Sequence, residues 1–280
     1  MLIGIVGSGI MGSGITEVAA VAGHKVILRS RNMASADATV ANTAKSLRRQ
    51  VDKGRIEVAH ADAALARISC TSDLGALSEC DIVIESVVED LDVKLALFAE
   101  LDDLCRPATI LATNTSTLPV VDMAMATNRA DRVCGVHFFN PAPVMSLVEI
   151  VKPLTASDET MAIVSEFASS CGKDVVAVKD EAGFIVNALL FPYLNNAVRM
   201  LERGTADAEG IDTAMKGGCG FPMGPLALLD LIGIDTSVSI LTALKEEFGD
   251  PWLTPAPTLK RMHTAGHLGR KSGIGFYPYG

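Results

Sequence analysis

The first fourteen residues constrain the fold of this chain more than any other segment. An apolar run at residues 2–6 leads into Gly7-x-Gly9-x-x-Gly12, and apolar residues at helical spacing follow the last glycine. In such a motif the first glycine permits a tight turn, the second lets a pyrophosphate approach the backbone, and the third lets a helix pack closely on the strand. The free N–H groups and dipole of that helix favour an anion. The segment therefore predicts a dinucleotide-binding strand, turn and helix. The residues expected to contact the cofactor here are Gly7, Gly9, Ile10, Met11 and Gly12.

The end of the second predicted strand, residues 25–28, bears on which dinucleotide binds. NAD-binding chains usually carry an acid about 20 residues after the glycine motif, where it holds the ribose hydroxyls. This chain has Arg29-Ser30-Arg31 there. A carboxylate would repel a 2′-phosphate, whereas a small hydroxyl residue between two guanidiniums can bind and neutralise it. We therefore expect NADP(H) in preference to NAD(H). NAD(H) stays open, because both arginines could instead be solvated charges at the end of a strand.

Length and composition narrow the class of protein. A chain of 280 residues fits two unequal domains better than one. The formal net charge of −9 argues against general binding of nucleic acid. The six cysteines form no CxxC or Cys/His cluster, so neither a zinc site nor a disulfide framework is expected. With no targeting segment and no apolar run near about 18 residues, we expect a cytoplasmic protein that does not enter a membrane.

Strand and helix patterns alternate over residues 1–181, which is typical of a doubly wound, mostly parallel sheet with helices on both faces. After the second strand, strands are expected at residues 68–70, 81–85, 109–112, 133–137, 147–151 and 175–178, with helices at 33–53, 61–66, 93–104 and 159–171. From residue 182 only helices are expected, at 184–203, 206–215, 226–248 and 255–265. The chain is thus predicted to join a Rossmann-type dinucleotide-binding domain, 1–181, to an all-helical C-terminal domain, 182–280, that serves the substrate and dimerisation.

The segment 226–232 is apolar on nearly every side. A homodimer interface in the helical domain would use that apolar surface, although a purely internal core would account for it equally well.

Four polar residues stand where the carboxyl edge of the sheet or the start of the helical domain should be. Ser116 follows a strand, His137 ends one, and Glu149 lies inside an apolar strand, where a carboxylate needs a partner. Asn187 falls on the first turn of the first C-terminal helix. Each of these residues alone is more often structural than catalytic. Their joint placement in a dinucleotide fold favours a dehydrogenase.

Oxidation of an alcohol by NAD(P) requires a base that takes a proton while hydride leaves the same carbon. A histidine can act in both directions near neutral pH, and a carboxylate on its second nitrogen fixes the tautomer and stabilises the imidazolium. We expect His137 to be this base and Glu149 its partner. Ser116 and Asn187 would then hydrogen-bond the reacting oxygen.

Further motifs run in order through the chain. They are Glu85-Ser-Val-Val-Glu89-Asp-Leu-Asp-Val-Lys94, Asn114-Thr-Ser116, His137-Phe-Phe-Asn140-Pro141, Leu147-Val-Glu149, Gly183-Phe-Ile-Val-Asn187, Pro222-Met-Gly-Pro-Leu226 and Leu268-Gly-Arg-Lys-Ser-Gly273-x-Gly-Phe-Tyr277. From end to end this set resembles the 3-hydroxyacyl-CoA dehydrogenases, and within them the short bacterial 3-hydroxybutyryl-CoA type. Ser30 departs from the pattern, since most members have Asp or Glu there.

The resemblance implies interconversion of (S)-3-hydroxyacyl-CoA, in particular 3-hydroxybutyryl-CoA, and 3-oxoacyl-CoA, in particular acetoacetyl-CoA. It implies that His137 and Glu149 are the catalytic pair, with Ser116 and Asn187 on the substrate oxygen. Lys53, with Arg48 and Arg49 as weaker candidates, would meet the phosphates of CoA. Further cofactor contacts would come from Glu89, Lys94, Asn114, Ser116 and Asn140. The alternatives are a dehydrogenase of a free 3-hydroxy acid or sugar acid, and an NAD(P)H-binding protein without turnover.

Overall fold

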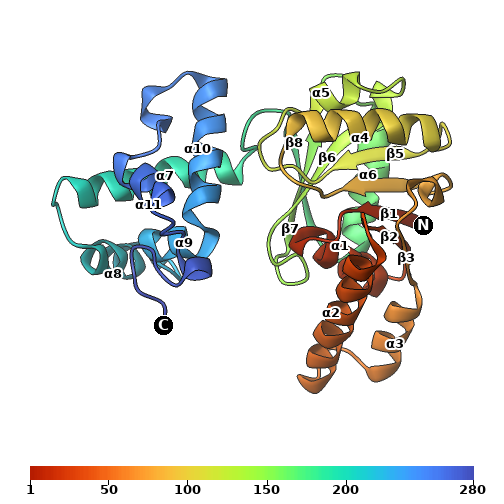
Figure 1. Cartoon of the computed structure of the whole chain (residues 1–280), viewed down its shortest axis with the longest axis horizontal. Helices are drawn as coiled ribbons and strands as arrows, with labels where there is room; N and C mark the ends of the chain where they lie inside the picture. The colour runs from red at the N-terminus through yellow and green to blue at the C-terminus, as the bar shows by residue number, and fades with distance from the viewer. The chain divides into compact units, whose positions relative to one another are not determined.

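An eight-stranded sheet organises Met1–Asp180, the first of two units into which the chain divides (Figure 1). The structure is a computed structural model that describes all 280 residues. Its strands are β1 (Leu2–Val6), β2 (Lys25–Arg29), β3 (Ile68–Thr71), β4 (Ile82–Glu85), β5 (Ile110–Thr113), β6 (Val133–Phe138), β7 (Leu147–Lys152) and β8 (Asp174–Lys179). They lie in the order β3-β2-β1-β4-β5-β6-β7-β8, and only β6 and β7 pair antiparallel. The expected Rossmann-type, mostly parallel sheet is confirmed.

The strand order reverses between β1 and β4. In doubly wound sheets, ligands bind outside the carboxyl ends of the strands at such a switch point. The glycine turn that comes after β1 therefore stands where this topology places a dinucleotide. Toward the other edge of the sheet, the reversed strand β7 sets Glu149 directly opposite His137 of β6.

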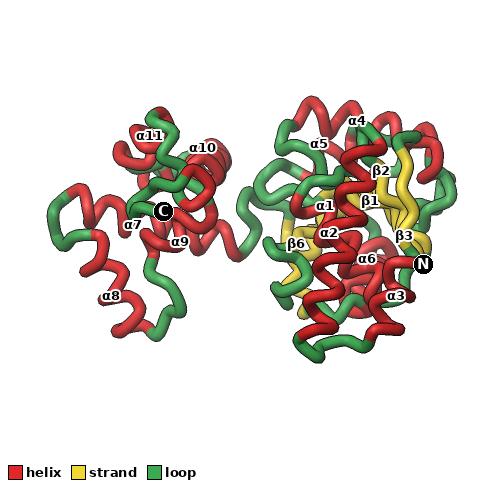
Figure 2. Tube along the Cα trace, turned by 60° about the horizontal axis from the view of Figure 1, so that its bottom comes forward, coloured by secondary structure: helices red, strands yellow, loops and turns green.

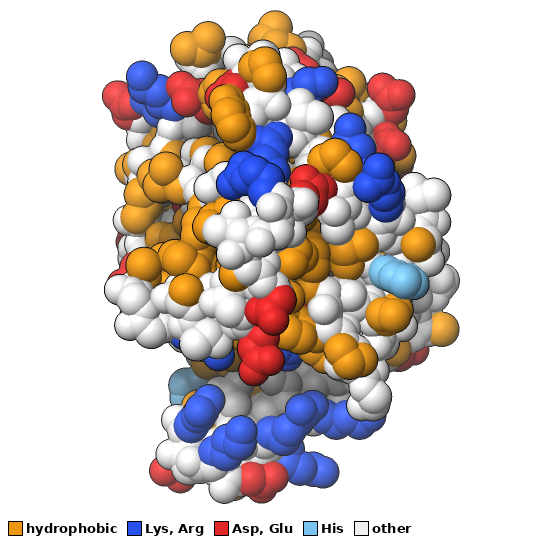
Figure 3. Space-filling view, turned by 90° about the vertical axis from the view of Figure 1, so that its left-hand side faces the viewer, with side chains coloured by type: hydrophobic (Ala, Val, Ile, Leu, Met, Phe, Trp, Pro, Cys, Tyr) orange, Lys and Arg blue, Asp and Glu red, His pale blue; other side chains and the backbone are white.

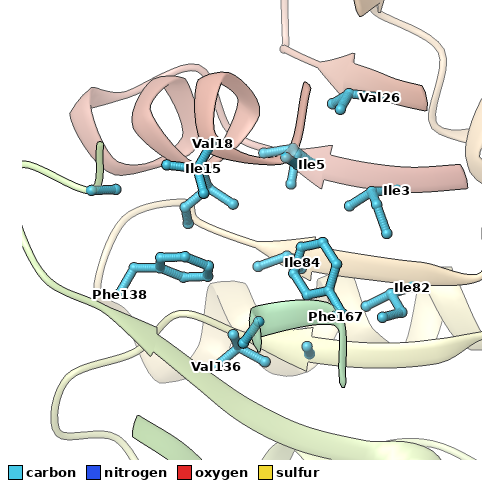
Figure 4. Close-up of a cluster of buried hydrophobic side chains, with 14 of the residues drawn as sticks. Ile3, Ile5, Ile15, Val18, Val26, Ile82, Ile84, Val136, Phe138 and Phe167 are labelled. Carbon is cyan, nitrogen blue, oxygen red and sulfur yellow. The ribbon is translucent and has the colours of Figure 1, made fainter. Parts of the chain in front are cut away.

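Helices cover both faces of the sheet. They are α1 (Ile10–Val21), α2 (Met33–Asp52), α3 (Val58–Ala66), α4 (Leu91–Leu104), α5 (Val120–Met125) and α6 (Asp158–Ser170), with α1 and α2 in front of the strands in Figure 2. One hydrophobic cluster joins Ile3, Ile84 and Phe138 of the strands to Ile15 of α1 and Phe167 of α6 (Figure 4). The short helix α5 was not predicted, because six residues are too few to show a helical period.

Side chains alternate between the two faces of a strand. Ile84, Val136 and Phe138 belong to the cluster of Figure 4, so Glu85 and His137 must point to the opposite face. A Cβ built on Gly135 would lie 3.3 Å from Val120 of α5, which identifies the helix on that second face. The polar side chains near the carboxyl ends of β4, β5 and β6 therefore share the face that α5 covers.

The second unit, Glu181–Gly280, contains only helices, as expected from its sequence pattern. They are α7 (Val186–Glu202), α8 (Ala208–Cys219), α9 (Pro225–Ile232), α10 (Ile234–Phe248) and α11 (Pro257–Thr264), around a core of Leu194, Leu226, Leu229, Leu241 and Leu244. The predicted single helix at 226–248 is wrong. Gly233 has a φ of 107°, and α9 and α10 meet there at 98°. No single helix is long and apolar enough to cross a membrane, and α9 with α10 reach that length only as this bent pair.

The C-terminal segment is tied to α9 by one buried carboxylate. Asp230 accepts hydrogen bonds from the backbone N–H groups of Phe276 and Tyr277, at 2.9 and 3.0 Å, and from the Tyr279 hydroxyl at 3.0 Å. The motif that ends at Tyr277 thus has a structural use, since it anchors the end of the chain.

Glu17 on α1 offers a test of the packing between α1 and α2. Its carboxylate is buried and accepts hydrogen bonds from Ser46 and Gln50, at 2.9 and 2.7 Å. Burial raises the pKa of this carboxyl, and the two hydrogen bonds oppose the rise. Because the folded pKa lies above the unfolded one, this group lowers stability as the pH rises from the unfolded pKa through the folded one.

We therefore expect Glu17→Gln, which keeps an acceptor oxygen, to raise the stability by on the order of 1 kcal/mol at pH 7.5. Near pH 3.5, below the unfolded pKa of about 4.3 and therefore below the raised folded pKa, the gain should largely disappear, because the wild-type carboxyl is then mostly protonated in both states. Melting temperatures at the two pH values measure this, with the exposed Glu166→Gln of α6 as control. An equal gain at both values would contradict the proposed cause.

Candidate active site

Three of the four expected catalytic residues lie together at the carboxyl edge of the sheet. The Nδ1 atom of His137 is 2.7 Å from Oε2 of Glu149, and its Nε2 atom is 3.2 Å from Oγ of Ser116. Glu149 is 0% exposed and His137 is 4% exposed. The ring of Phe139 packs beside the imidazole, with centroids 4.5 Å apart. Since a carboxylate can only accept, Nδ1 carries the proton shared with Glu149, and Nε2 is the atom that can take one.

The loop after β5 holds Ser116 in place. Asn114 accepts a hydrogen bond from the backbone N–H of Phe138 at 2.9 Å, which ties this loop to the strand that carries His137. Asn114 was expected to contact the cofactor; in the structure its side-chain oxygen has this structural contact.

The glycine turn fits a bound dinucleotide. A Cβ on Gly12 would lie 2.0 Å from the carbonyl oxygen of Gly7, and one on Gly7 would lie 2.2 Å from the carbonyl oxygen of Ser86. The turn therefore has no room for a side chain at either of these two positions. A Cβ on Gly9 would meet nothing within 4 Å, and Gly9 is the N-cap of α1 with no side chain capping it. This end of α1 thus has room beside Gly9 and no side-chain cap, which suits the binding of a pyrophosphate at the helix N-terminus. Ile10 is exposed and Met11 half-buried at the same end of the helix.

At the end of β2 the structure shows a contact that the sequence did not predict. Ser30 is buried, at 4% exposed, and its hydroxyl lies 2.8 Å from the hydroxyl of Ser8 in the glycine turn. One hydroxyl of this pair donates to the other, so the second keeps its own proton for a ligand. Arg29 is partly buried, and its Nε atom has no hydrogen-bond partner, while Arg31 is exposed. The site thus adds Ser8 to the residues predicted from the sequence.

Glu89 and Lys94 were expected to contact the cofactor. In the structure Lys94 is 1% exposed, and its ammonium lies 2.7 Å from Glu85 and 3.2 Å from Glu89. The buried Lys94 therefore contacts protein carboxylates, and only Glu89 of the two has an exposed surface. Glu85 is not among the contact residues that the sequence predicts. A carboxylate that ends an apolar strand is the signal that could have marked it as a buried charge in need of a partner.

The remaining predicted residues lie on other elements. Asn187 is buried on the first turn of α7, in the second unit. Asn140 is exposed in the loop after β6, and Lys53 is exposed at the C-cap of α2. Figure 3 shows Lys and Arg side chains gathered on the lobe that α2 and α3 form. The functional roles of these three residues stay predictions.

Comparison with known proteins identifies the family of this chain. A family model described as the 3-hydroxyacyl-CoA dehydrogenase NAD binding domain matches residues 2–181, and one described as the C-terminal domain matches residues 183–279. A protein of Mycobacterium tuberculosis named 3-hydroxybutyryl-CoA dehydrogenase is 47% identical over 279 residues, which is 99% of this chain and 98% of that one. The human mitochondrial hydroxyacyl-coenzyme A dehydrogenase is 41% identical over 282 residues, covering 98% of this chain and 90% of the relative.

The fold is also closely similar to that of a solved structure. The crystal structure of FadB2 of M. tuberculosis matches with a TM-score of 0.97 at 47% identity, covering 99% of this chain and 98% of that one. Family models that cover both units, and relatives that match over almost their whole length, place this chain in the 3-hydroxyacyl-CoA dehydrogenase family of oxidoreductases, whose first domain binds a nicotinamide cofactor.

Proposed function

We propose that this protein interconverts (S)-3-hydroxybutyryl-CoA and acetoacetyl-CoA, with NADP(H) preferred over NAD(H). The hydrogen-bonded series Ser116, His137 and Glu149 carries the proposal, because it supplies a proton acceptor beside a predicted dinucleotide site. The names of the related enzymes support the substrate.

His137 would exchange the proton of the reaction. In the oxidative direction its Nε2 takes the proton of the substrate hydroxyl, and in the reductive direction it returns that proton to the oxygen. Glu149 holds the ring by Nδ1 and stabilises the imidazolium that forms. The Ser116 hydroxyl, which lies beside Nε2, would hydrogen-bond the substrate oxygen and orient it. The bound nicotinamide accepts or supplies the hydride.

The segment after β2 supports the preference for NADP(H). No carboxylate stands in Arg29-Ser30-Arg31, and the two arginines bring positive charge to the end of β2. The paired hydroxyls of Ser8 and Ser30 can donate one further hydrogen bond. Two guanidiniums and a hydroxyl pair suit a 2′-phosphate better than bare ribose hydroxyls.

The other predicted roles complete the proposal. Lys53, beside Arg48 and Arg49, would meet the phosphates of CoA, and Asn187 would hydrogen-bond the substrate oxygen. The helical unit would serve the substrate and form a homodimer. Its large exposed apolar side chains, Leu189, Leu231, Phe248 and Trp252, support an interface there.

Oxidation assays with three substrates test the substrate assignment. We expect turnover of (S)-3-hydroxybutyryl-CoA, and far slower reaction of the (R) thioester and of free 3-hydroxybutyrate. Turnover of the free acid but not the thioester would replace our assignment by a 3-hydroxy acid dehydrogenase. Binding of NADPH without turnover of any of them would indicate a protein that only binds the cofactor.

A further inference from the structure

A row of exposed cations lies along α2. Lys45, Arg49 and Lys53 follow one another at four-residue spacing, so they form a cation row on one face of the helix. None of the three forms a salt bridge. Like charges at this spacing destabilise a helix, and the chain as a whole carries a net charge of −9. This local excess of positive charge therefore suits a ligand with several anionic groups, such as the phosphates of CoA.

The buried face of α2 is short of large apolar side chains. Only one of its buried residues is large and apolar, namely Leu47, and the others are Ala36, Thr39 and Thr43. After Leu47 every residue of α2 is exposed or half-buried, although the cation row continues to Lys53. Since a helix in a protein is held mainly by packing of its apolar face, such packing fixes the second half of α2 only weakly.

Glu17 of α1 supplies a second kind of contact there. It is 5% exposed, and its Oε1 atom accepts hydrogen bonds from the Ser46 hydroxyl at 2.9 Å and from the Gln50 side-chain amide at 2.7 Å. These two donors stand before and after Arg49 in the sequence. One buried carboxylate oxygen thus holds the segment that carries the cations against α1.

Stability is a weak reason for a carboxylate in this place. Burial raises the pKa of Glu17, so its ionised form lowers stability near neutral pH. An apolar side chain could fill the space between the helices without that cost. Only an acceptor, however, can form two directed hydrogen bonds with α2. Because hydrogen bonds have a preferred length and angle, they fix where one helix lies along the other.

We infer that Glu17 is a positioning residue for CoA, because it holds the cation row Lys45, Arg49 and Lys53 in the place where the phosphates of CoA bind. The inference rests on the proposed function, which assigns those phosphates to the end of α2. It adds Lys45 to the residues expected there. Glu17 itself is buried and acts only through its hydrogen bonds to α2.

Glu17→Leu removes both hydrogen bonds together with the buried charge, so the variant is expected to fold. We expect the KM for acetoacetyl-CoA to rise about 10-fold, close to what one charge-assisted hydrogen bond contributes. The kcat at saturation and the Kd for NADPH should stay within about twofold, because the phosphates of CoA are remote from the reacting carbon. Glu17→Gln keeps an acceptor oxygen and should restore most of the affinity. Glu166→Leu, the same change at an exposed position on α6, is the control and should leave the KM unchanged.

A shorter substrate separates positioning from a general loss of structure. Acetoacetyl pantetheine carries the same reacting group but no phosphate, so its kcat/KM should be equal in Glu17→Leu and in the parent protein. Lys53→Ala should raise the KM for acetoacetyl-CoA. Its addition to Glu17→Leu should raise that KM little further, because changes that act on one shared contact are not additive.

The outcomes distinguish this inference from the proposed function. An unchanged KM for acetoacetyl-CoA in Glu17→Leu, with a raised KM in Lys53→Ala, would overturn the inference alone. An equal loss of kcat/KM with both thioesters would also overturn it, because the effect would then lie outside the phosphate site. If removal of the whole cation row leaves the KM for acetoacetyl-CoA unchanged, the phosphate site proposed on α2 is wrong, and the inference is wrong with it. A parent protein that turns over neither thioester would overturn the proposed reaction as well.

Discussion

Replacement of His137 by glutamine is expected to lower kcat about 10²- to 10⁴-fold, the range for a positioned general acid or base. Glutamine can occupy much of the same space, but it cannot exchange a proton near neutral pH. We expect the loss in kcat and not in cofactor binding. His137 lies near the carboxyl end of β6, whereas the predicted pyrophosphate site follows a different strand, β1. The Kd for NADPH should therefore stay within about threefold of the parent value, as expected when an interaction belongs to the transition state.

Two further variants sharpen that experiment. His263→Gln, at an exposed position on α11, controls for loss of a histidine and should leave kcat unchanged. Glu149→Gln keeps a hydrogen-bonding side chain but removes the charge 2.7 Å from Nδ1. It should lower kcat by a smaller factor than His137→Gln does. Near-normal turnover of His137→Gln would show that another group exchanges the proton.

Introduction of an acid after β2 is expected to remove the preference for NADP(H). In Ser30→Asp a carboxylate would stand beside Ser8 and between two arginines, where it repels a 2′-phosphate and pairs with the guanidiniums. One or two charge-assisted hydrogen bonds correspond to a discrimination on the order of 100-fold. We therefore expect kcat/KM for NADPH to fall about 100-fold and kcat/KM for NADH to hold or rise.

The control for this change is Ser169→Asp, an exposed serine on α6 in the same unit. It alters the net charge equally and should leave the ratio of the two kcat/KM values as it was. Since Ser30 is buried, the melting temperature of Ser30→Asp is measured alongside. An unchanged preference in a folded Ser30→Asp protein would show that the Arg29-Ser30-Arg31 segment does not select the cofactor.

Much of the site could be predicted because its constraints are local. The spacing of Gly7, Gly9 and Gly12 reflects a turn in which two of the three positions have no room for a Cβ. Glu149 in an apolar strand demanded a partner, and a histidine on a neighbouring strand was available. The structure places the two opposite each other, at 2.7 Å.

The features that could not be predicted depend on contacts between distant segments. The apolar pattern of β7 is the same whichever way the strand runs, so the sequence does not show that β7 pairs antiparallel with β6. Gly233 lies in a run that is apolar on both sides, and a single glycine within such a pattern is compatible with a continuous helix. The sequence pattern around Lys94 is that of a solvated helix residue, yet Lys94 is 1% exposed because Glu85 lies at the end of a different element.

A steady-state assay with acetoacetyl-CoA and each reduced cofactor tests the proposed reaction and the proposed cofactor preference together. We expect reduction of acetoacetyl-CoA with NADPH, at a kcat/KM about 100-fold above that with NADH, and loss of the reaction in His137→Gln. No reduction with either cofactor would contradict the proposed reaction. Faster reduction with NADH would contradict the role given to Arg29, Ser30 and Arg31.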